Sequence, residues 1–408
     1  MKIAYLSLEF PPRIFGGLGV YADEISREMT SLGQKISVFT MGDGKLARYE
    51  DHNGVEVFRM NPVSLRDGLE LFLSEESRAW GEGLYFLEDL ICINQLSASG
   101  IMDNGPFDLC VAHDWLGLMG GMAAKRQGLP FIYHVHGLEA GRSDSPNPQL
   151  VALEREGAEM ADGVITVSEA MKRELISIGT PEEKISVCYH GVNAEFFNPQ
   201  RAKKKEIAHL RERYGFSKND IIILFVGRLE PVKGVRELFS AFSLVRAQHE
   251  NARLLVVGKG SLEGWAAGEI QRISEGSDDK SITLVTDFLN PKEKMLHYAL
   301  ADLCVFPSIY EPFGIVALEA SAMGKPSVVG ASGTSGLAEI VQNPGTSSPT
   351  GVHVNARDAK DIAWGINLAL EDPDRLTAWG RNARKRAQEM FTWRKAAERT
   401  LEVYRKVA

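Results

Sequence analysis

The chain has 408 residues, of which 44% are hydrophobic and 25% charged, as expected for a globular protein of two or three domains. Its formal net charge of −8 argues against a general nucleic-acid binder, whose surface would be basic. The four cysteines are far apart and form no C-x-x-C pair, so they predict buried free thiols and no zinc site.

The chain opens with MKIAYLSLEFPP, in which one lysine precedes a short apolar run that ends before Glu9. This run is too short for the apolar region of a signal peptide. No later stretch approaches the length of a membrane span. We therefore expect a cytoplasmic protein without membrane contact.

Short apolar segments, each followed by a turn and a helical pattern, recur along the chain. Alternating strands and helices of this kind predict parallel sheets covered by helices on both faces, an α/β fold with two doubly wound Rossmann-like domains. The expected strands are residues 2–8, 35–41, 108–113, 131–136, 163–168, 185–189, 221–226, 254–257, 282–285, 303–307 and 327–330.

The polar, basic segment 198–219 separates two groups of these strands and is expected to be a linker with a helix. We predict a first domain of residues 1–195 and a second of residues 196–392, followed by a last helix at about 393–408. Segment 67–101 carries Phe72, Trp80, Tyr85 and Phe86 without clear strand character. It is expected to be helical cover on the first sheet, or else part of an acceptor groove.

Three glycines, Gly16, Gly17 and Gly19, follow the first expected strand and precede an amphipathic helix. Glycines at such a position let the backbone approach a ligand closely, although a plain tight turn is the alternative. The order does not match G-x-G-x-x-G, which argues against a nicotinamide-dependent enzyme.

Two further strand ends carry polar side chains. His113 and Asp114 end one strand at the edge where open α/β sheets bind ligands, although Asp114 could also cap the following helix. His134 and His136 end the next strand on one face, so a metal pair is conceivable. The sequence offers no third ligand at a helpful spacing, and a hydrogen-bonded histidine at a strand end is the other interpretation.

The second domain opens with a strand that delivers Arg228 and, five residues later, Lys233 to one loop. Two cations in such a loop can neutralise a diphosphate leaving group by bidentate and point-charge contacts. Two solvated surface charges are the alternative.

The stretch 303–326 reads as a buried strand, a loop and an apolar helix. The helix start near Gly314 would present the N–H groups of Gly314, Ile315 and Val316, which is an anion site by geometry and dipole. Glu311 precedes this helix and Glu319 lies about one and a half turns into it, so both could accept hydrogen bonds from hydroxyls of a ligand whose phosphate lies at the helix start.

A metal-binding D-x-D occurs only at Asp372-Pro373-Asp374, where a proline-containing helix start explains it better. We therefore expect no metal and no cofactor.

Together these motifs resemble the retaining GT-B glycosyltransferases, in particular the glycogen and starch synthases. The resemblance spans nearly the whole chain and rests on Gly16–Leu18, His136, Arg228 with Lys233, and the Glu-x7-Glu pair Glu311 and Glu319. One departure is Ile14, where the synthases typically have a lysine, with Arg13 one place off.

The resemblance implies two domains facing across a cleft, with the last helix crossing back to the first domain. It implies transfer of a hexosyl, chiefly glucosyl, group from ADP- or UDP-glucose to a glucan, with retention and without metal. It also implies roles for the singled-out residues: His136, Arg228, Lys233 and Glu311 in catalysis; Gly16, Gly17, Arg228, Lys233, Gly314, Ile315, Val316 and Glu319 in donor binding; His113 and Asp114 near the sugar and acceptor.

Two alternatives remain open. One is a relative that uses another sugar nucleotide, such as a mannosyl or N-acetylglucosaminyl donor, on a lipid or small acceptor, for which the basic segment 201–213 could touch an anionic membrane. The other is a non-catalytic two-domain sugar-binding protein, which would usually be exported.

Overall fold

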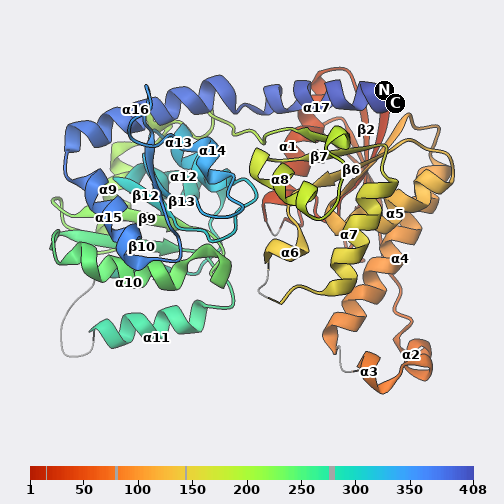
Figure 1. The fold of residues 1–408 in the computed structure, drawn as a ribbon, viewed down its shortest axis with the longest axis horizontal. Helices are drawn as coiled ribbons and strands as arrows, with labels where there is room; N and C mark the ends of the chain where they lie inside the picture. Colours follow the sequence, from red (N-terminus) through yellow and green to blue (C-terminus); the bar gives the residue numbers. More distant parts are fainter. Residues whose placement is uncertain (15, 79–80, 143–144, 275–280) are drawn as a thin grey trace. The chain divides into compact units, whose positions relative to one another are not determined.

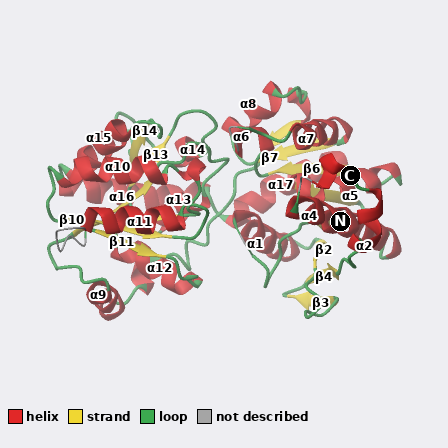
Figure 2. Cartoon of the chain, turned by 90° about the horizontal axis from the view of Figure 1, so that it is seen from below, coloured by secondary structure: helices red, strands yellow, loops and turns green. Residues whose placement is uncertain are grey.

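A computed structural model describes residues 1–14, 16–78, 81–142, 145–274 and 281–408 (Figure 1). The chain forms two compact units. Unit 1 comprises Met1–Val167, Lys172–Cys188 and Trp393–Ala408, and unit 2 comprises Ser168–Met171 and Tyr189–Thr392. Within each unit, strands run between layers of helices (Figure 2).

The sheet of unit 1 has eight strands in the order β3-β4-β2-β1-β5-β6-β7-β8. All neighbours are parallel except β3 and β4, which form an antiparallel edge. The strands are β1 Lys2–Leu6, β2 Lys35–Met41, β3 Tyr49–His52, β4 Val55–Met60, β5 Leu109–His113, β6 Phe131–Val135, β7 Gly163–Thr166 and β8 Ile185–Val187.

The central strand β1 shows why this sheet needs helices on both faces. Tyr5 and Leu6 are both buried, and alternation sends them to opposite faces. The Tyr5 hydroxyl lies 3.0 Å from the hydroxyl of Tyr404 in the last helix, which packs on one face beside α1. On the other face, Gly117 of α5 lies so close to Leu6 that a Cβ there would meet the Leu6 carbonyl oxygen at 2.7 Å.

Unit 1 therefore has α1 and α17 on one face, and α4 and α5 on the other with α7 packed on α5. Short α2, α3 and α6 are single turns. The helices are α1 Gly17–Ser31, α2 Arg66–Leu69, α3 Glu75–Arg78, α4 Glu82–Asp103, α5 Asp114–Arg126, α6 Glu139–Arg142, α7 Pro148–Met160, α8 Glu169–Ser177 and α17 Trp393–Val407, with 3₁₀ turns η1 Glu70–Phe72 and η2 Glu182–Lys184. The first three residues of α8 are assigned to unit 2 and the rest of the helix to unit 1.

The sheet of unit 2 has six parallel strands in the order β11-β10-β9-β12-β13-β14. Its strands are near-continuous apolar runs, as expected where both faces are covered. The strands are β9 Ile221–Val226, β10 Ala252–Val257, β11 Ile282–Val285, β12 Leu303–Phe306, β13 Ser327–Gly330 and β14 Gly351–Val354.

One face of this sheet packs its odd-numbered β9 side chains, Ile223 and Phe225, with apolar residues of α10 and α15 in a fully buried core. The other face contacts α12 and α13. The helices are α9 Lys204–Arg213, α10 Val235–Arg246, α11 Glu263–Ser274, α12 Pro291–Leu300, α13 Ile315–Ala322, α14 Leu337–Ile340, α15 Ala359–Leu370 and α16 Pro373–Met390, with 3₁₀ turns η3 Pro199–Arg201 and η4 Pro231–Lys233.

Both sheets reverse their strand order at one place, between β1 and β5 in unit 1 and between β9 and β12 in unit 2. Open α/β sheets bind ligands beyond the carboxyl ends of the strands at such a switch point. The residues that follow these four strands are therefore the first places to look for a site.

The predicted α/β fold with two doubly wound domains is confirmed. The sequence pattern missed β3 and β14, which are edge strands, and β4, which lies between β3 and β2. In segment 67–101, the long helix α4 covers the sheet as expected, with Leu90 and Ile93 buried, whereas Phe86 is 44% exposed and Trp80 lies outside the described residues.

The proline-containing helix start at Asp372 is also confirmed. The Asp372 carboxylate caps α16 by accepting hydrogen bonds from the N–H groups of Asp374 and Arg375, at 2.9 and 3.2 Å. Cys110, Cys188 and Cys304 are buried free thiols, as predicted, whereas Cys92 is only partly buried. Among the described helices, none combines the length and apolarity that crossing a bilayer requires.

Candidate functional site

In unit 2, the loops after β9 and β12 bring cations and an acid to the switch point. Lys233 follows β9, and its ammonium donates a hydrogen bond of 2.6 Å to Oε2 of Glu311, which follows β12. The Ser308 hydroxyl donates to the same oxygen at 3.1 Å. Both partners of the ion pair are largely shielded, with side chains 15% and 13% exposed, so each stabilises the charge of the other.

Arg228 stands apart from this pair. Its side chain is exposed, and among the described residues it forms no hydrogen bond or ion pair. A guanidinium that is not engaged within the protein can direct its fork of donors to a phosphate.

A glycine makes the close approach of these two loops possible. Gly234 has a φ of 67° and sits so near the β12 loop that a Cβ would lie 1.9 Å from the Pro307 carbonyl oxygen. The Val232 carbonyl accepts a hydrogen bond of 2.8 Å from the Ile309 N–H, which ties the loops together. The position of Lys233 is therefore fixed by backbone contacts.

The helix α13 begins at Ile315 without a side-chain cap, and Gly314 at its start has a φ of 108°. A Cβ on Gly314 would lie 2.4 Å from the Leu337 side chain, so only glycine fits. No described residue accepts a hydrogen bond from the N–H of Ile315 or Val316. These donors and the helix dipole leave the start of α13 suited to an anion.

Glu319 lies one and a half turns further along and is 4% exposed. Lys294 donates to its Oε1 at 2.5 Å, and the Tyr298 hydroxyl donates to its Oε2 at 2.8 Å. A carboxylate can accept about four hydrogen bonds, so each oxygen keeps capacity for a ligand hydroxyl. The sequence pattern did not point to Lys294 and Tyr298, whose only signal is an i, i+4 spacing on α12.

In unit 1, the glycines after β1 start helix α1. Gly16 is the residue before the helix, and Gly17 is the first helical residue. The Gly16 N–H donates a hydrogen bond of 3.0 Å to the carboxylate of Glu9. The Arg13 guanidinium donates a hydrogen bond of 2.8 Å to the carbonyl of Gly42, so it reaches the end of β2.

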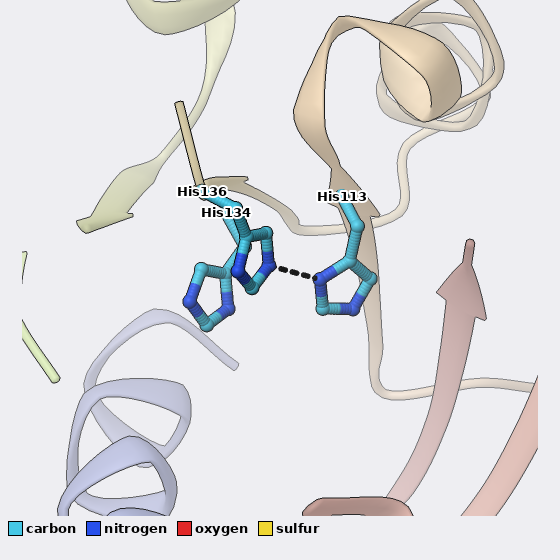
Figure 3. Close-up of side chains that lie close together, drawn as sticks. All are labelled: His113, His134 and His136. Atoms are coloured by element: carbon cyan, nitrogen blue, oxygen red, sulfur yellow. Dashed lines mark hydrogen bonds between the residues drawn. The ribbon is translucent and has the colours of Figure 1, made fainter. Parts of the chain in front are cut away.

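The ends of β5 and β6 bring three histidines together (Figure 3). The strand register pairs His113 directly with His134, and Nδ1 of His113 lies 3.1 Å from Nε2 of His136. The rings of His134 and His136 stack with centroids 4.4 Å apart and planes 13° from parallel. His113, which lies on a different strand, supplies the third imidazole that the sequence pattern did not reveal.

This histidine cluster is enclosed by aromatic rings. The ring centroid of Tyr21 lies 5.8, 5.0 and 4.7 Å from those of His113, His134 and His136, and Tyr5 lies 5.0 Å from His113. Burial lowers the pKa of His113 to about 3, because the charged imidazolium would lose its hydration.

Asp114 holds the backbone that carries His136. Its carboxylate accepts hydrogen bonds from the His136 N–H at 2.7 Å and from Arg142 at 3.0 Å. It does not cap α5, so the capping alternative is wrong. Its φ of 53° is rare for a residue with a side chain, and such conformations, which cost about 1–3 kcal/mol, concentrate at functional sites.

A second acid, Glu154 of α7, supports the chain beyond His136. It is 1% exposed, and its two oxygens lie 3.0 and 3.1 Å from the Glu139 N–H. Burial raises its pKa from 4.5 to about 8. Nothing in the sequence pattern singles out Glu154 or Arg142, because only the fold brings them to their partners, the Glu139 N–H and the Asp114 carboxylate.

The raised pKa of Glu154 predicts a pH dependence of stability. Folding favours the protonated carboxyl of Glu154. Its contribution to the free energy of unfolding is therefore complete below about pH 4.5 and is lost as the pH rises towards about 8. The parent should therefore lose free energy of unfolding relative to Glu154→Gln across this range, by up to about 1.4 kcal/mol per pH unit.

Urea unfolding of both proteins between about pH 5 and 8.5 measures this difference. Glu156→Gln, at an exposed position of the same helix, is the matched control and should follow the parent. A parallel dependence of all three proteins would contradict the assignment.

The structure thus brings Lys233 and Glu311 together in unit 2, near the start of α13 in sequence. It brings His113, Asp114 and His136 together in unit 1. Glu319 is linked to α12, through Lys294 and Tyr298.

Comparison with known proteins relates both units to sugar-transferring enzymes. Residues 15–196 match the family described as Glycosyltransferase Family 4, and residues 206–386 match Glycosyl transferases group 1. An uncharacterized glycosyltransferase of Methanocaldococcus jannaschii is 32% identical, over 99% of this chain and 98% of that protein.

Two further relatives carry more specific names. A glycogen synthase of Mycobacterium tuberculosis is 29% identical over 99% of this chain and 94% of its own, and a D-inositol 3-phosphate glycosyltransferase of Thermobispora bispora is 31% identical over 95% and 89%. Among solved structures, a sucrose-phosphate synthase of Thermosynechococcus elongatus has a similar fold, with a TM-score of 0.78 and 23% identity over 99% of this chain and 98% of its own.

Proposed function

The chain belongs to the GT-B glycosyltransferases, and from that premise we propose that it transfers a glucosyl group from ADP-glucose or UDP-glucose to an α-glucan with retention of configuration. The similarity to a glycogen synthase over nearly the full length of both chains supports this choice of a glucan acceptor.

One observation carries the proposal: the Lys233–Glu311 ion pair at the switch point of unit 2, followed three residues after Glu311 by the uncapped start of α13. A cation, a carboxylate and free backbone N–H groups suit three parts of a sugar nucleotide. The ammonium and the N–H groups of Gly314, Ile315 and Val316 suit the diphosphate, and the carboxylate suits sugar hydroxyls.

The remaining residues of unit 2 complete the donor site in this proposal. Arg228 binds the diphosphate with Lys233, and the two cations neutralise the charge that grows on the leaving group. Glu319 accepts hydrogen bonds from the ribose hydroxyls, while Lys294 and Tyr298 hold its carboxylate in place.

Unit 1 supplies the sugar side. His136 contacts the transferred sugar, Gly16 and Gly17 let the backbone approach the donor, and His113 and Asp114 lie on the acceptor side. Asp114 and the strand ends hold His136 in place, which is the preorganisation that transfer requires.

The reaction needs no protein base in this proposal. As the bond from the anomeric carbon to the phosphate oxygen breaks, the leaving phosphate takes the proton of the acceptor hydroxyl, whose oxygen forms the new bond on the same face. The protein's contribution is then positioning and charge stabilisation.

Incubation with ADP-glucose, UDP-glucose, GDP-mannose or UDP-N-acetylglucosamine, each with glycogen, tests the proposal. With ADP-glucose or UDP-glucose, we expect release of the nucleotide and an α-linked glucosyl product, which NMR identifies. A protein that only binds sugars would release none.

A second candidate is transfer to a small phosphorylated acceptor. It is favoured by the 31% identity to a D-inositol 3-phosphate glycosyltransferase. Turnover that requires inositol 3-phosphate and ignores glycogen would select this candidate.

Turnover is expected to persist in excess EDTA. Arg228, Lys233 and the start of α13 provide the positive charge that a divalent ion would otherwise bring, and the D-x-D aspartate Asp372 is used as a helix cap. The measurement is nucleotide release with and without EDTA. Loss of activity and its rescue by Mn²⁺ would reject the metal-free assignment.

A further inference from the structure

His113, His134 and His136 offer three imidazole nitrogens, one from each ring, that all lie within 4.8 Å of one another (Figure 3). In a tetrahedral zinc site with Zn–N distances of about 2.0–2.1 Å, ligand nitrogens lie about 3.3 Å apart. The pair His113 Nδ1 and His136 Nε2, at 3.1 Å, is already close to that separation.

The scaffold under these rings is fixed. His113 is the last residue of β5, His134 lies within β6 in direct register with it, and His136 follows β6 with its N–H bonded to Asp114. His113 and His134 are fully buried and His136 is half-buried, so an ion would enter past His136.

The ring orientations define what must change on binding. Stacked rings direct their lone pairs along nearly parallel lines, so His134 or His136 must turn about its χ2 angle for both to point at one ion. One contact that His134 would give up by turning is long, since its Nδ1 lies 3.4 Å from the Tyr21 hydroxyl.

The donor set selects the class of ion. Imidazole nitrogens suit zinc, cobalt, nickel and copper, whereas magnesium and manganese prefer oxygen ligands. The three rings supply no oxygen ligand. The neighbouring Asp114 carboxylate is engaged by the His136 N–H and by Arg142, and it offsets part of the charge of a bound cation.

We propose that His113, His134 and His136 form a binding site for a transition metal ion such as Zn²⁺, and that its occupation inhibits glycosyl transfer. The inhibition, which rests on the proposed role of His136, follows because a nitrogen bonded to the metal no longer contacts the sugar. The site is thus a point of control by zinc in an enzyme whose chemistry uses no metal.

Metal binding is measured without donor or acceptor, on protein first dialysed against EDTA and then against buffer. Calorimetry with Zn²⁺ should give one equivalent, and Co²⁺ should give the intense visible bands of a four-coordinate ion. His134→Phe keeps a ring in the stack but removes the nitrogens, and should weaken Co²⁺ binding at least about tenfold. His209→Gln, at an exposed position in unit 2, should bind as the parent does.

A second measurement needs no variant. With ¹⁵N-labelled imidazoles, Zn²⁺ should shift the ring signals of three of the nine histidines. Absence of binding at about 0.1 mM Zn²⁺, equal affinity of the parent and His134→Phe, or shifts of a different set of histidines would each overturn the site.

Inhibition is then tested with the best donor at the metal concentration that fills the site. Nucleotide release should fall at least tenfold and recover on addition of EDTA. Full binding with unchanged turnover would overturn the inhibitory role. Because the binding and NMR measurements use no sugar nucleotide, failure of the proposed function and failure of the metal site give different results.

Discussion

Arg228→Ala and Lys233→Ala are each expected to lower kcat by about 10²- to 10³-fold, which is typical for loss of one preorganised charge contact in a transition state. If the two cations stabilise a diphosphate that gains charge as the glycosidic bond breaks, their contribution grows towards the transition state. A contribution to binding alone would raise KM and leave kcat unchanged.

Arg228 gives the cleaner measurement. It is exposed and makes no hydrogen bond or ion pair among the described residues, so its removal should leave the melting temperature unchanged. Lys233 is paired with Glu311, and Lys233→Ala leaves that shielded carboxylate without its cation. Part of the loss in this variant will therefore come from a displaced Glu311.

Lys233→Arg separates charge from shape. It restores the positive charge but replaces a compact ammonium with a planar fork, so it should recover activity only in part. Lys292→Ala is the matched control, since Lys292 is an exposed lysine whose ion pair with Glu206 lies on the surface. A kcat within about threefold of the parent in both Arg228→Ala and Lys233→Ala would mean that these residues are not at the leaving group.

The sequence could predict these residues because each follows a buried apolar run, and strand ends meet at one edge of a parallel sheet. The pattern therefore predicts the positions of Arg228 and Lys233 after β9 and of Glu311 after β12. The same reasoning located His113 and His136. It could not show that His113 and His134 are in register. A helix lies between β5 and β6 along the chain, and their pairing is set by the packing of the whole sheet.

Side chains that act from the middle of helices escaped the pattern for a different reason. Lys294 and Tyr298 look like ordinary residues of an amphipathic helix, and only the packing of α12 beside α13 brings them to Glu319. Glu154 likewise lies within α7 and bonds a backbone N–H. Partners of this kind are fixed by tertiary structure and leave no local spacing to detect.

Glu319→Ala is expected to weaken nucleotide binding about 10- to 100-fold, the range for loss of charge-assisted hydrogen bonds worth about 1.5–3 kcal/mol. His136→Ala should bind nucleotide nearly as the parent does and lose turnover. The difference follows from the proposed roles, because Glu319 bonds the ribose and His136 contacts only the transferred sugar.

Control variants are needed because Glu319 is buried and bonded to two side chains. Glu319→Gln keeps an acceptor for the Tyr298 hydroxyl but loses the charge, so it should fall between the parent and Glu319→Ala. Lys294→Met removes the cation beside Glu319 and leaves the carboxylate in place. If Glu319 binds the ribose directly, Lys294→Met should weaken nucleotide binding less than Glu319→Ala does.

Calorimetric titration with ADP and UDP gives the nucleotide affinities of these variants, and nucleotide release with glycogen gives their turnover. The two measurements are independent, because ADP and UDP contain the ribose that Glu319 would bind but lack the transferred hexosyl group that His136 would contact. The His136→Ala protein should therefore match the parent in the first measurement and fail in the second. Equal loss of nucleotide affinity in Glu319→Ala and His136→Ala would contradict this division. ADP and UDP lack the transferred sugar, so a residue that contacts only that sugar cannot affect their binding.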